Sequence, residues 1–339
     1  MSERNRRAFL IGIFGAVGVF AVLFFLVGGR SVLGSLSGAD PTLVAATFAF
    51  GLCWLLAWSL MLRTVLATLG VDVPLAKSFL IYAGAVFANN VTPFGQAGGE
   101  PVAALLISKV SRARYETGFA GIASVDVLNV VPSLSLVLVS VGYYATNFAV
   151  GDRLGTAVGS ALASVFGIAV LLLLAWRYRH VLVEWTAGAA AAVVDRFGTD
   201  QGDPADLEGE IRERSSRFFD HVERVATSRE RLATVLGLSL LGWLFQGAAL
   251  VAAFAAVGHD VPVYVVLFAI PLGNLAGVAP LPGGLGGIEA AFVALLVPTT
   301  GVAAPAVTAA VLIYRGAIYW MPVLIGGGSV TAFGVRSLA

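Results

Sequence analysis

Cysteine, histidine and lysine are scarce in this sequence, and their scarcity excludes several classes of protein. The 339 residues include one cysteine, three histidines and only two lysines, Lys77 and Lys109. A single cysteine excludes a disulfide framework, and Cys53 and the histidines do not have the spacing of a metal site. No glycine-rich loop followed by a lysine is present, so an ATP-driven pump is not expected. We expect no metal ion and no cofactor.

Charge is also scarce. Only 12% of the residues are charged, whereas a soluble domain carries about 25%. The net charge of +1 argues against a nucleic-acid partner, because nucleic-acid binders normally carry a basic face. Instead, 58% of the residues are hydrophobic and the mean hydropathy is +0.89. These values indicate a protein of the cell membrane whose main partners are membrane lipids.

Long apolar segments indicate how often the chain crosses the membrane. A helix needs about 20 apolar residues to cross a bilayer. Six segments approach or reach this length, namely 8–27, 43–62, 117–140, 156–176, 232–257 and 303–325. Two further apolar regions, 78–108 and 262–297, are each interrupted near the middle. We therefore expect an all-α polytopic membrane protein with about six full transmembrane helices and two re-entrant broken-helix hairpins. The segment 8–27 is expected to be a retained anchor.

Basic residues suggest the orientation, because Lys and Arg gather in cytoplasmic loops. Arg4, Arg6 and Arg7 place the N-terminus in the cytoplasm, and the same rule places the C-terminus there. Region 78–108 lies between two cytoplasmic markers, so we expect it to enter and leave on one side. The alternative, in which 78–94 crosses fully, would place three basic residues outside.

The two interrupted regions share a motif, P-x-G-x-x-G-x-E. Its members are Pro93, Gly95, Gly98 and Glu100 in the first region and Pro282, Gly284, Gly287 and Glu289 in the second. A single ionisable residue follows each glutamate after 26 positions, Asp126 in the first case and Arg315 in the second. Under the orientation above, the two copies point in opposite directions. Inverted repeats with broken helices are typical of secondary transporters, with the substrate site between the repeats.

The repeat suggests a division of the chain into four parts. Residues 1–42 form an anchor helix and an external loop, and residues 43–147 form the first repeat. Residues 148–231 connect the repeats through a span and a polar cytoplasmic linker, and residues 232–339 form the second repeat. The alternating charges of the linker are typical of a solvated surface. A role in docking a partner is the alternative.

Buried ionisable residues mark the candidate site, because each is costly inside a membrane. Asp126 and Arg315 could form an ion pair across the repeat interface, or Arg315 could hold an anionic headgroup, and the two readings are compatible. The two glutamates could cap helices or bind protons. The candidate substrate-binding residues are Pro93, Gly95, Gln96, Gly98, Glu100, Asp126, Pro282, Gly284, Gly287, Glu289, Tyr314 and Arg315. Of these, Tyr314 suits packing better than binding.

The segments TPFGQAGGEP and PLPGGLGGIE, together with Tyr314-Arg315, resemble the flippase-like transmembrane region of lysylphosphatidylglycerol synthases. The resemblance covers nearly the whole chain and implies a polytopic fold that moves or presents lipids with polar headgroups. Some archaeal relatives are fused to a glycosyltransferase acting on polyprenyl phosphate, which implies a lipid-modifying enzyme or glycosyltransferase as a possible partner. No soluble synthase domain follows here, so we do not expect synthase activity.

These observations favour a transporter over an enzyme. The leading hypothesis is a flippase for an anionic or aminoacylated phospholipid or a polyprenyl-phosphate-linked lipid. The alternative is a membrane scaffold that does not transport and docks a separate glycosyltransferase or lipid-modifying enzyme. A membrane enzyme is the weakest reading, because the sequence shows no nucleophile beside a base. The sequence leaves the oligomeric state open.

Overall fold

A computed structural model describes most of the two predicted repeats. The described residues are 18–19, 21–22, 24–92, 96–147, 177–178, 228–278 and 282–332. These residues form helices and no strand. The predicted span 156–176, most of the anchor 8–27 and nearly all of the linker within 178–231 lie outside the described residues.

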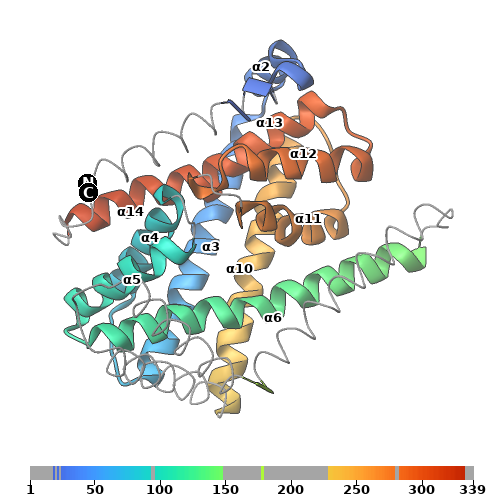
Figure 1. Ribbon diagram of the computed structural model, residues 1–339. Coiled ribbons are helices and arrows are strands. Elements are labelled where there is room, and N and C mark those ends of the chain that lie inside the picture. The colour runs from blue at the N-terminus through green and yellow to red at the C-terminus, as the bar shows by residue number, and fades with distance from the viewer. Residues whose placement is uncertain are drawn as a thin grey trace, which may run out of the picture. The chain divides into compact units, whose positions relative to one another are not determined.

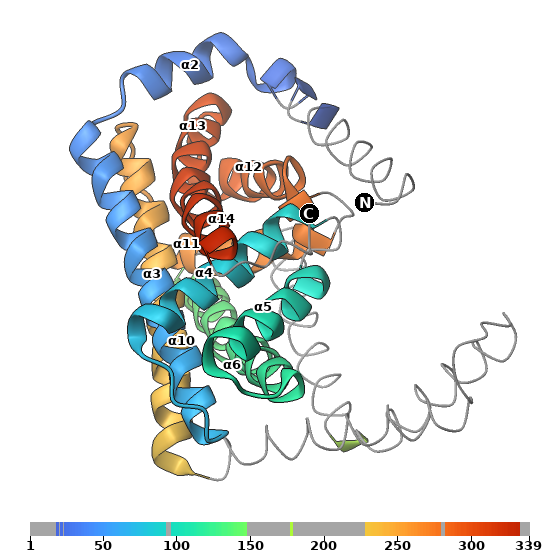
Figure 2. The same cartoon turned by 90° about the vertical axis from the view of Figure 1, so that its left-hand side faces the viewer.

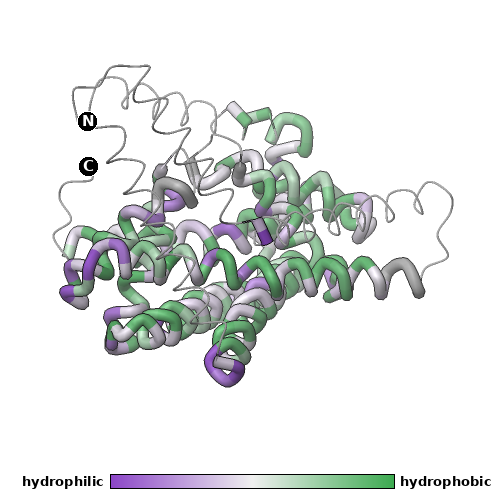
Figure 3. Tube along the Cα trace, turned by 60° about the horizontal axis from the view of Figure 1, so that its bottom comes forward, coloured by the Kyte–Doolittle hydropathy of each residue, from purple (hydrophilic) through white to green (hydrophobic). Residues whose placement is uncertain are grey.

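Four helices are long and apolar enough to cross a membrane. They are α3 (Pro41–Thr68), α6 (Tyr115–Asn147), α10 (Arg229–Ala256) and the stretch Ala304–Ala332. That last stretch comprises α13 (Ala304–Arg315), the π-helix η3 (Gly316–Trp320) and α14 (Met321–Ala332). Hydrophobic residues run along most of the helices, and hydrophilic residues gather near their ends (Figure 3). The chain is an all-α polytopic membrane protein, as the sequence predicted.

Both interrupted regions form helical hairpins. In the first, α4 (Leu75–Val91) packs against α5 (Gln96–Ser111). In the second, α11 (Val263–Leu275) packs against α12 (Gly287–Thr300). Between α11 and α12 lie two short 3₁₀ turns, η1 (Ala276–Val278) and η2 (Pro282–Gly284). In both hairpins the break falls at the Pro/Gly motif, because proline and glycine are the residues that a helix interior tolerates least.

The expected external loop at 29–40 is largely helical, which corrects the sequence reading. Helix α2 (Gly29–Ser37) packs against α13, and its Val32 is fully buried. The helix starts after Gly28, whose φ of 89° lies in the left-handed region. Helix α2 was not predicted because its nine residues, GRSVLGSLS, are rich in glycine and serine, which have low helix propensity.

The helices of the two repeats have matching bounds. Adding 189 to Glu100 and Asp126 gives Glu289 and Arg315. The same difference relates the start of α6 at 115 to the start of α13 at 304, and the end of α5 at 111 to the end of α12 at 300. The first set, α3 to α6, therefore has the same order and spacing of helices as the second set, α10 to α14.

The two helix sets are inverted relative to each other. Helices α3 and α10 lie side by side (Figures 1 and 2). The N–H of Asp40, before α3, donates to the carbonyl of Ala256 at the end of α10 over 2.8 Å. Toward the other end, Trp58 Nε1 of α3 donates to the Ser239 carbonyl of α10 over 3.2 Å. The corresponding first helices are thus antiparallel. In addition, α4 packs on α14 and α6 packs on α11, which are equivalent contacts under this inversion.

A second repeated motif, G-x-D-V-P, follows the first helix of each set. It reads GVDVP at residues 70–74 and GHDVP at residues 258–262. Gly70 and Gly258 have φ values of 78° and 82°, so both end a helix in the left-handed conformation that favours glycine. This motif is visible in the sequence, and it supports the repeat independently of the Pro/Gly/Glu motif.

Candidate functional site

The break of the second hairpin requires glycine at its turn. Gly283 and Gly284 have φ values of 55° and 64°, where a side chain is strained. A Cβ atom on Gly283 would also lie 2.4 Å from the Tyr319 ring and 2.7 Å from the Asn90 carbonyl oxygen. Asn90 belongs to α4, the first hairpin. The tips of the two hairpins therefore meet at a contact that leaves no space for a side chain.

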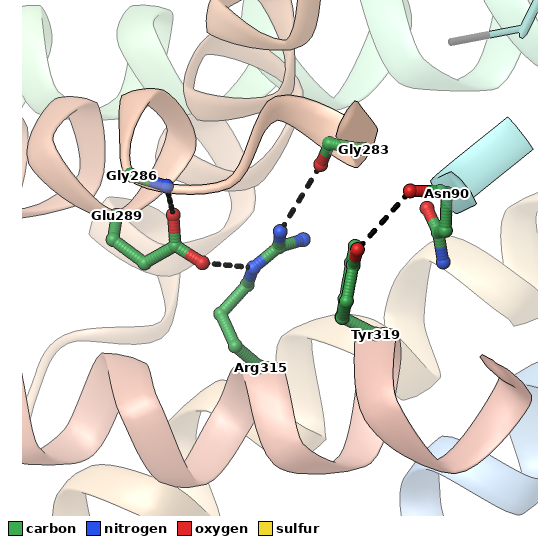
Figure 4. A network of polar contacts seen from close by, with 6 residues as sticks. All are labelled: Asn90, Gly283, Gly286, Glu289, Arg315 and Tyr319. Carbon is green, nitrogen blue, oxygen red and sulfur yellow. Dashed lines mark hydrogen bonds and ion pairs between the residues drawn. The ribbon is translucent and has the colours of Figure 1, made fainter. Parts of the chain in front are cut away.

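Glu289 caps the helix that follows this break. It stands at the third position of α12, and its Oε2 accepts a hydrogen bond from the N–H of Gly286 over 2.6 Å (Figure 4). The residue is only 1% exposed. Of the two roles considered for this glutamate, the structure shows the capping contact. A carboxylate at this position also interacts favourably with the positive end of the helix dipole.

Arg315, the last residue of α13, binds the same carboxylate. Its Nε donates to Glu289 Oε1 over 2.7 Å, and its Nη2 donates to the carbonyl of Gly283 over 3.2 Å (Figure 4). Arg315 is 7% exposed. The prediction that Arg315 forms an ion pair with Asp126 is therefore wrong, because Arg315 pairs with the glutamate of its own repeat. Helices α12 and α13 pack together, which brings residues 26 apart in sequence into contact.

Tyr319, which is not among the candidates predicted from the sequence, joins this pair to the first hairpin. The guanidinium carbon of Arg315 lies 4.5 Å from the centre of the Tyr319 ring, which is a cation–π distance. The Tyr319 hydroxyl donates to the Asn90 carbonyl over 3.1 Å (Figure 4). Tyr319 lies in the π-helix η3, an element often found at functional sites. The sequence did contain one indication of this contact, because an aromatic residue four positions after an arginine lies on the same face of a helix.

The first repeat contains the equivalent pair. Glu100 of α5 and Asp126 of α6 lie close enough for their carboxyl groups to interact, and Asp126 also interacts electrostatically with Tyr82 of α4. In both repeats the glutamate after the break thus contacts the ionisable residue 26 positions later. The sequence spacing predicted which residues correspond, but it did not predict that each pair lies within its own repeat.

The other predicted residues lie as follows. Gln96 begins α5 and Gly98 lies within its first turn, Pro282 begins η2, and Gly287 begins α12. Pro93 and Gly95 lie outside the described residues. Tyr314 is 1% exposed, donates its hydroxyl to Gln246 over 3.2 Å and meets the ring of Phe292 edge-on. Tyr314 is therefore a core residue, as its suitability for packing suggested.

A polar network that the sequence reading did not foresee joins three helices beside the first pair. Asn129 lies three residues after Asp126 on α6. The hydroxyl of Ser239 donates to the Asn129 side chain, and Trp243 Nε1 donates to the Asn129 carbonyl over 3.2 Å. Both partners belong to α10. Together with the bond from Trp58 to Ser239, this network joins α3, α6 and α10.

The family comparison agrees with the motifs and their geometry. The model of the lysylphosphatidylglycerol synthase transmembrane region matches residues 9–326. The chain belongs to this family. As a member of the lysylphosphatidylglycerol synthase transmembrane-region family, it contains within the matched range both Pro/Gly motifs, the buried pair Glu289–Arg315, the pair Glu100–Asp126, and Tyr319.

Relatives of this family member differ in length. Two UPF0104 membrane proteins of Methanothermobacter thermautotrophicus are 27% identical to it over 335 and 341 residues. These alignments cover 96% and 98% of this chain and 93% and 96% of the two relatives. The glycosyltransferase AglD of Haloferax volcanii is 27% identical over 368 residues, covering 98% of this chain but 55% of AglD. The chain therefore aligns with about half of that longer protein.

Proposed function

We propose that this protein moves a lipid with an anionic headgroup across the cell membrane. The observation that carries the proposal is the position of Arg315. It is buried where the tips of two oppositely oriented hairpins meet, between Gly283 of one hairpin and the Tyr319–Asn90 contact to the other. A buried charge in a membrane is costly and marks a substrate path by default.

The chemistry of this place favours a phosphate-bearing substrate. A guanidinium forms forked hydrogen bonds to phosphate and remains charged when buried. The start of α12 lies against the same arginine through Glu289 and Gly286, and helix starts attract phosphate. The substrate class is therefore an anionic or aminoacylated phospholipid or a polyprenyl-phosphate-linked lipid. The candidate residues named from the sequence, apart from the core residue Tyr314, are proposed as its binding region.

The inverted helix sets provide a route for transport. In transporters built this way, one repeat rocks against the other around a site between them, which opens it to each side in turn. The contact between Gly283 and Asn90 is where the two sets would separate. We further propose that both termini are cytoplasmic, as the basic residues indicate.

Reconstitution tests this proposal directly. Vesicles containing the purified chain and a headgroup-labelled phosphatidylglycerol would be treated with an impermeant quencher to measure exchange between leaflets. Arg315→Gln should reduce exchange to the level of empty vesicles. Arg114→Gln is the matched control, because the Arg114 side chain is 72% exposed and pairs with Glu116 at 3.5 Å. Equal exchange by the wild type and a correctly folded Arg315→Gln variant would refute transport through this site.

A second candidate is a membrane module that serves a separate glycosyltransferase without moving lipid itself. The observation in its favour is the similarity to AglD, where the matching region is 55% of a protein named a glycosyltransferase. This candidate predicts that the wild type exchanges no labelled lipid in vesicles. It also predicts that glycosyltransferase activity on a polyprenyl-phosphate lipid rises when the chain is added to the vesicles.

A further inference from the structure

We propose that Glu289 is an internal competitor for the headgroup. In this proposal the Glu289 carboxylate occupies the position of the substrate phosphate, and a headgroup binds by displacing it, while the displaced carboxylate takes up one proton. The inference rests on the proposed function and adds to it a mechanism of exchange and a coupling ion.

The geometry shows an anion already bound at this position. One carboxylate oxygen of Glu289 accepts from the Arg315 guanidinium over 2.7 Å, and the other accepts from the Gly286 amide over 2.6 Å (Figure 4). A guanidinium and an amide at a helix start are both donors that commonly bind phosphate in proteins. Two non-ester oxygens of a phosphodiester can bridge the same two donors. The site is therefore assembled, and its anion is supplied by the protein itself.

The carboxylate and a phosphate exclude each other at this position. Glu289 is 1% exposed and Arg315 is 7% exposed, so two negative charges here would repel each other with little screening. A phosphate that takes the donors leaves Glu289 buried without a cation. An uncompensated buried charge is strongly unfavourable, and a proton removes it. Binding of the headgroup is therefore linked to proton uptake.

The surroundings offer no other cation to the displaced carboxylate among the described residues. The titratable groups that interact with the pair are the phenols of Tyr314 and Tyr319. Other ionisable groups on the neighbouring helices have different positions. Arg30 of α2 and Lys77 at the start of α4 are exposed, and Arg63 donates to the Val73 carbonyl. Tyr264 contacts Tyr143, while Tyr82 and Glu100 interact with Asp126. Because none of the described residues offers a second cation, a proton taken up from solution neutralises the displaced carboxylate in this proposal.

Binding to the purified chain in detergent tests this mechanism without requiring transport. The probes are dihexanoyl phosphatidylglycerol, inorganic phosphate, and dihexanoylglycerol as the phosphate-free control, each measured by calorimetry across a range of pH. In the wild type, dihexanoyl phosphatidylglycerol should bind more tightly as the pH falls, because its phosphodiester keeps a single charge across this range and binding takes up a proton on the protein. Phosphatidylglycerol binding alone indicates a lipid site, and equal binding of inorganic phosphate indicates that the acyl chains contribute little. Both results support the exchange.

Glu289→Gln is the decisive variant. Glutamine keeps the shape of the side chain but is not an anion, so the probe should bind about 5- to 150-fold more tightly, the range typical of coupled sites. The affinity of this variant for dihexanoyl phosphatidylglycerol should also no longer depend on pH. The double variant Glu289→Gln with Arg315→Gln should not bind the probe. Glu116→Gln, which changes an accessible carboxylate paired with Arg114, should behave like the wild type.

Two results would overturn the inference. The first is a Glu289→Gln variant that binds no more tightly than the wild type, and the second is a variant that keeps the pH dependence. Should this variant not fold, Glu289→Asp provides the same test, because its shorter side chain cannot span both donors and should give a smaller gain in affinity. If leaflet exchange requires Arg315 but these variants do not bind the probe more tightly, the proposed role of Glu289 is refuted and the proposed transport is not. Proton-linked binding without leaflet exchange would reject transport instead.

Discussion

Replacing Arg315 by glutamine should destabilise the protein far more than replacing an exposed arginine. The change leaves the Glu289 carboxylate, which is 1% exposed, without the guanidinium that lies 2.7 Å away. Removing one partner of a buried ion pair costs about 3–5 kcal/mol, because the other group loses the charge that compensated it. The exposed pair of Arg114 and Glu116 should contribute only about 0–1 kcal/mol.

A double-mutant cycle separates the pair from its individual members. Glu289→Gln should cost a similar amount to Arg315→Gln, so independent effects would sum to about 6–10 kcal/mol. The double variant should cost much less than this sum, since two neutral side chains leave no unpaired charge. The free energy of unfolding would be measured by loss of helicity on titration with a denaturing detergent in mixed micelles. The single cysteine, half-buried Cys53 of α3, allows a second measurement with a thiol-reactive dye.

The control and the refuting result follow from the same numbers. Arg114→Gln should change the free energy of unfolding by no more than about 1 kcal/mol. Equal losses for Arg315→Gln and Arg114→Gln would show that the buried pair is not formed in the membrane-embedded protein. Additive losses in the double variant would show that Arg315 and Glu289 do not interact, and the site described above would then be wrong.

Two further predictions concern contacts between helices. Gly326→Ala should destabilise the protein by about 1–3 kcal/mol and lower the thermal unfolding temperature. The new Cβ would lie 2.0 Å from the Ala83 carbonyl oxygen and force α14 away from α4. Gly328→Ala is the control, since no atom lies within 4 Å of its Cβ, and it should leave the thermal unfolding temperature unchanged or raise it. Tyr319→Phe should cost about 0.5–1.5 kcal/mol in the same unfolding titration, because it removes the hydrogen bond to the Asn90 carbonyl but keeps the ring over the guanidinium. Tyr319→Leu removes both contacts and should cost more, and equal losses in the two variants would contradict a role for the ring.

The order of the helices was largely predictable, because apolar length and helix-breaking residues act locally. The span at 43–62 lies within α3, the span at 232–257 lies within α10 except for its last residue, and both Pro/Gly motifs mark a hairpin break. Helix α2 was missed because its stability comes from packing on α13, with Val32 buried there. Such contacts between distant segments have no pattern within the short segment itself.

The site was predictable in its members but not in its pairing. The spacing of 26 residues identified Glu289 with Arg315 and Glu100 with Asp126 as corresponding pairs. Opposite charge then suggested that Asp126 and Arg315 meet, whereas each residue contacts the glutamate of its own repeat. Charge gives a preference for a partner, but the packing of adjacent helices decides which partner is within reach.

By itself the sequence determined that this chain is a helical membrane protein with two inverted, interrupted repeats. Hydropathy, the distribution of basic residues and the Pro/Gly breaks are all properties of short segments of sequence. Only the tertiary structure decided that Glu289 fills the donors around Arg315 and that Tyr319 ties them to Asn90. These contacts depend on the directions of the helices and the distances between them. The π-helical turn after Arg315 and the close approach of helices at Gly283 are features of the tertiary structure that bring these side chains together.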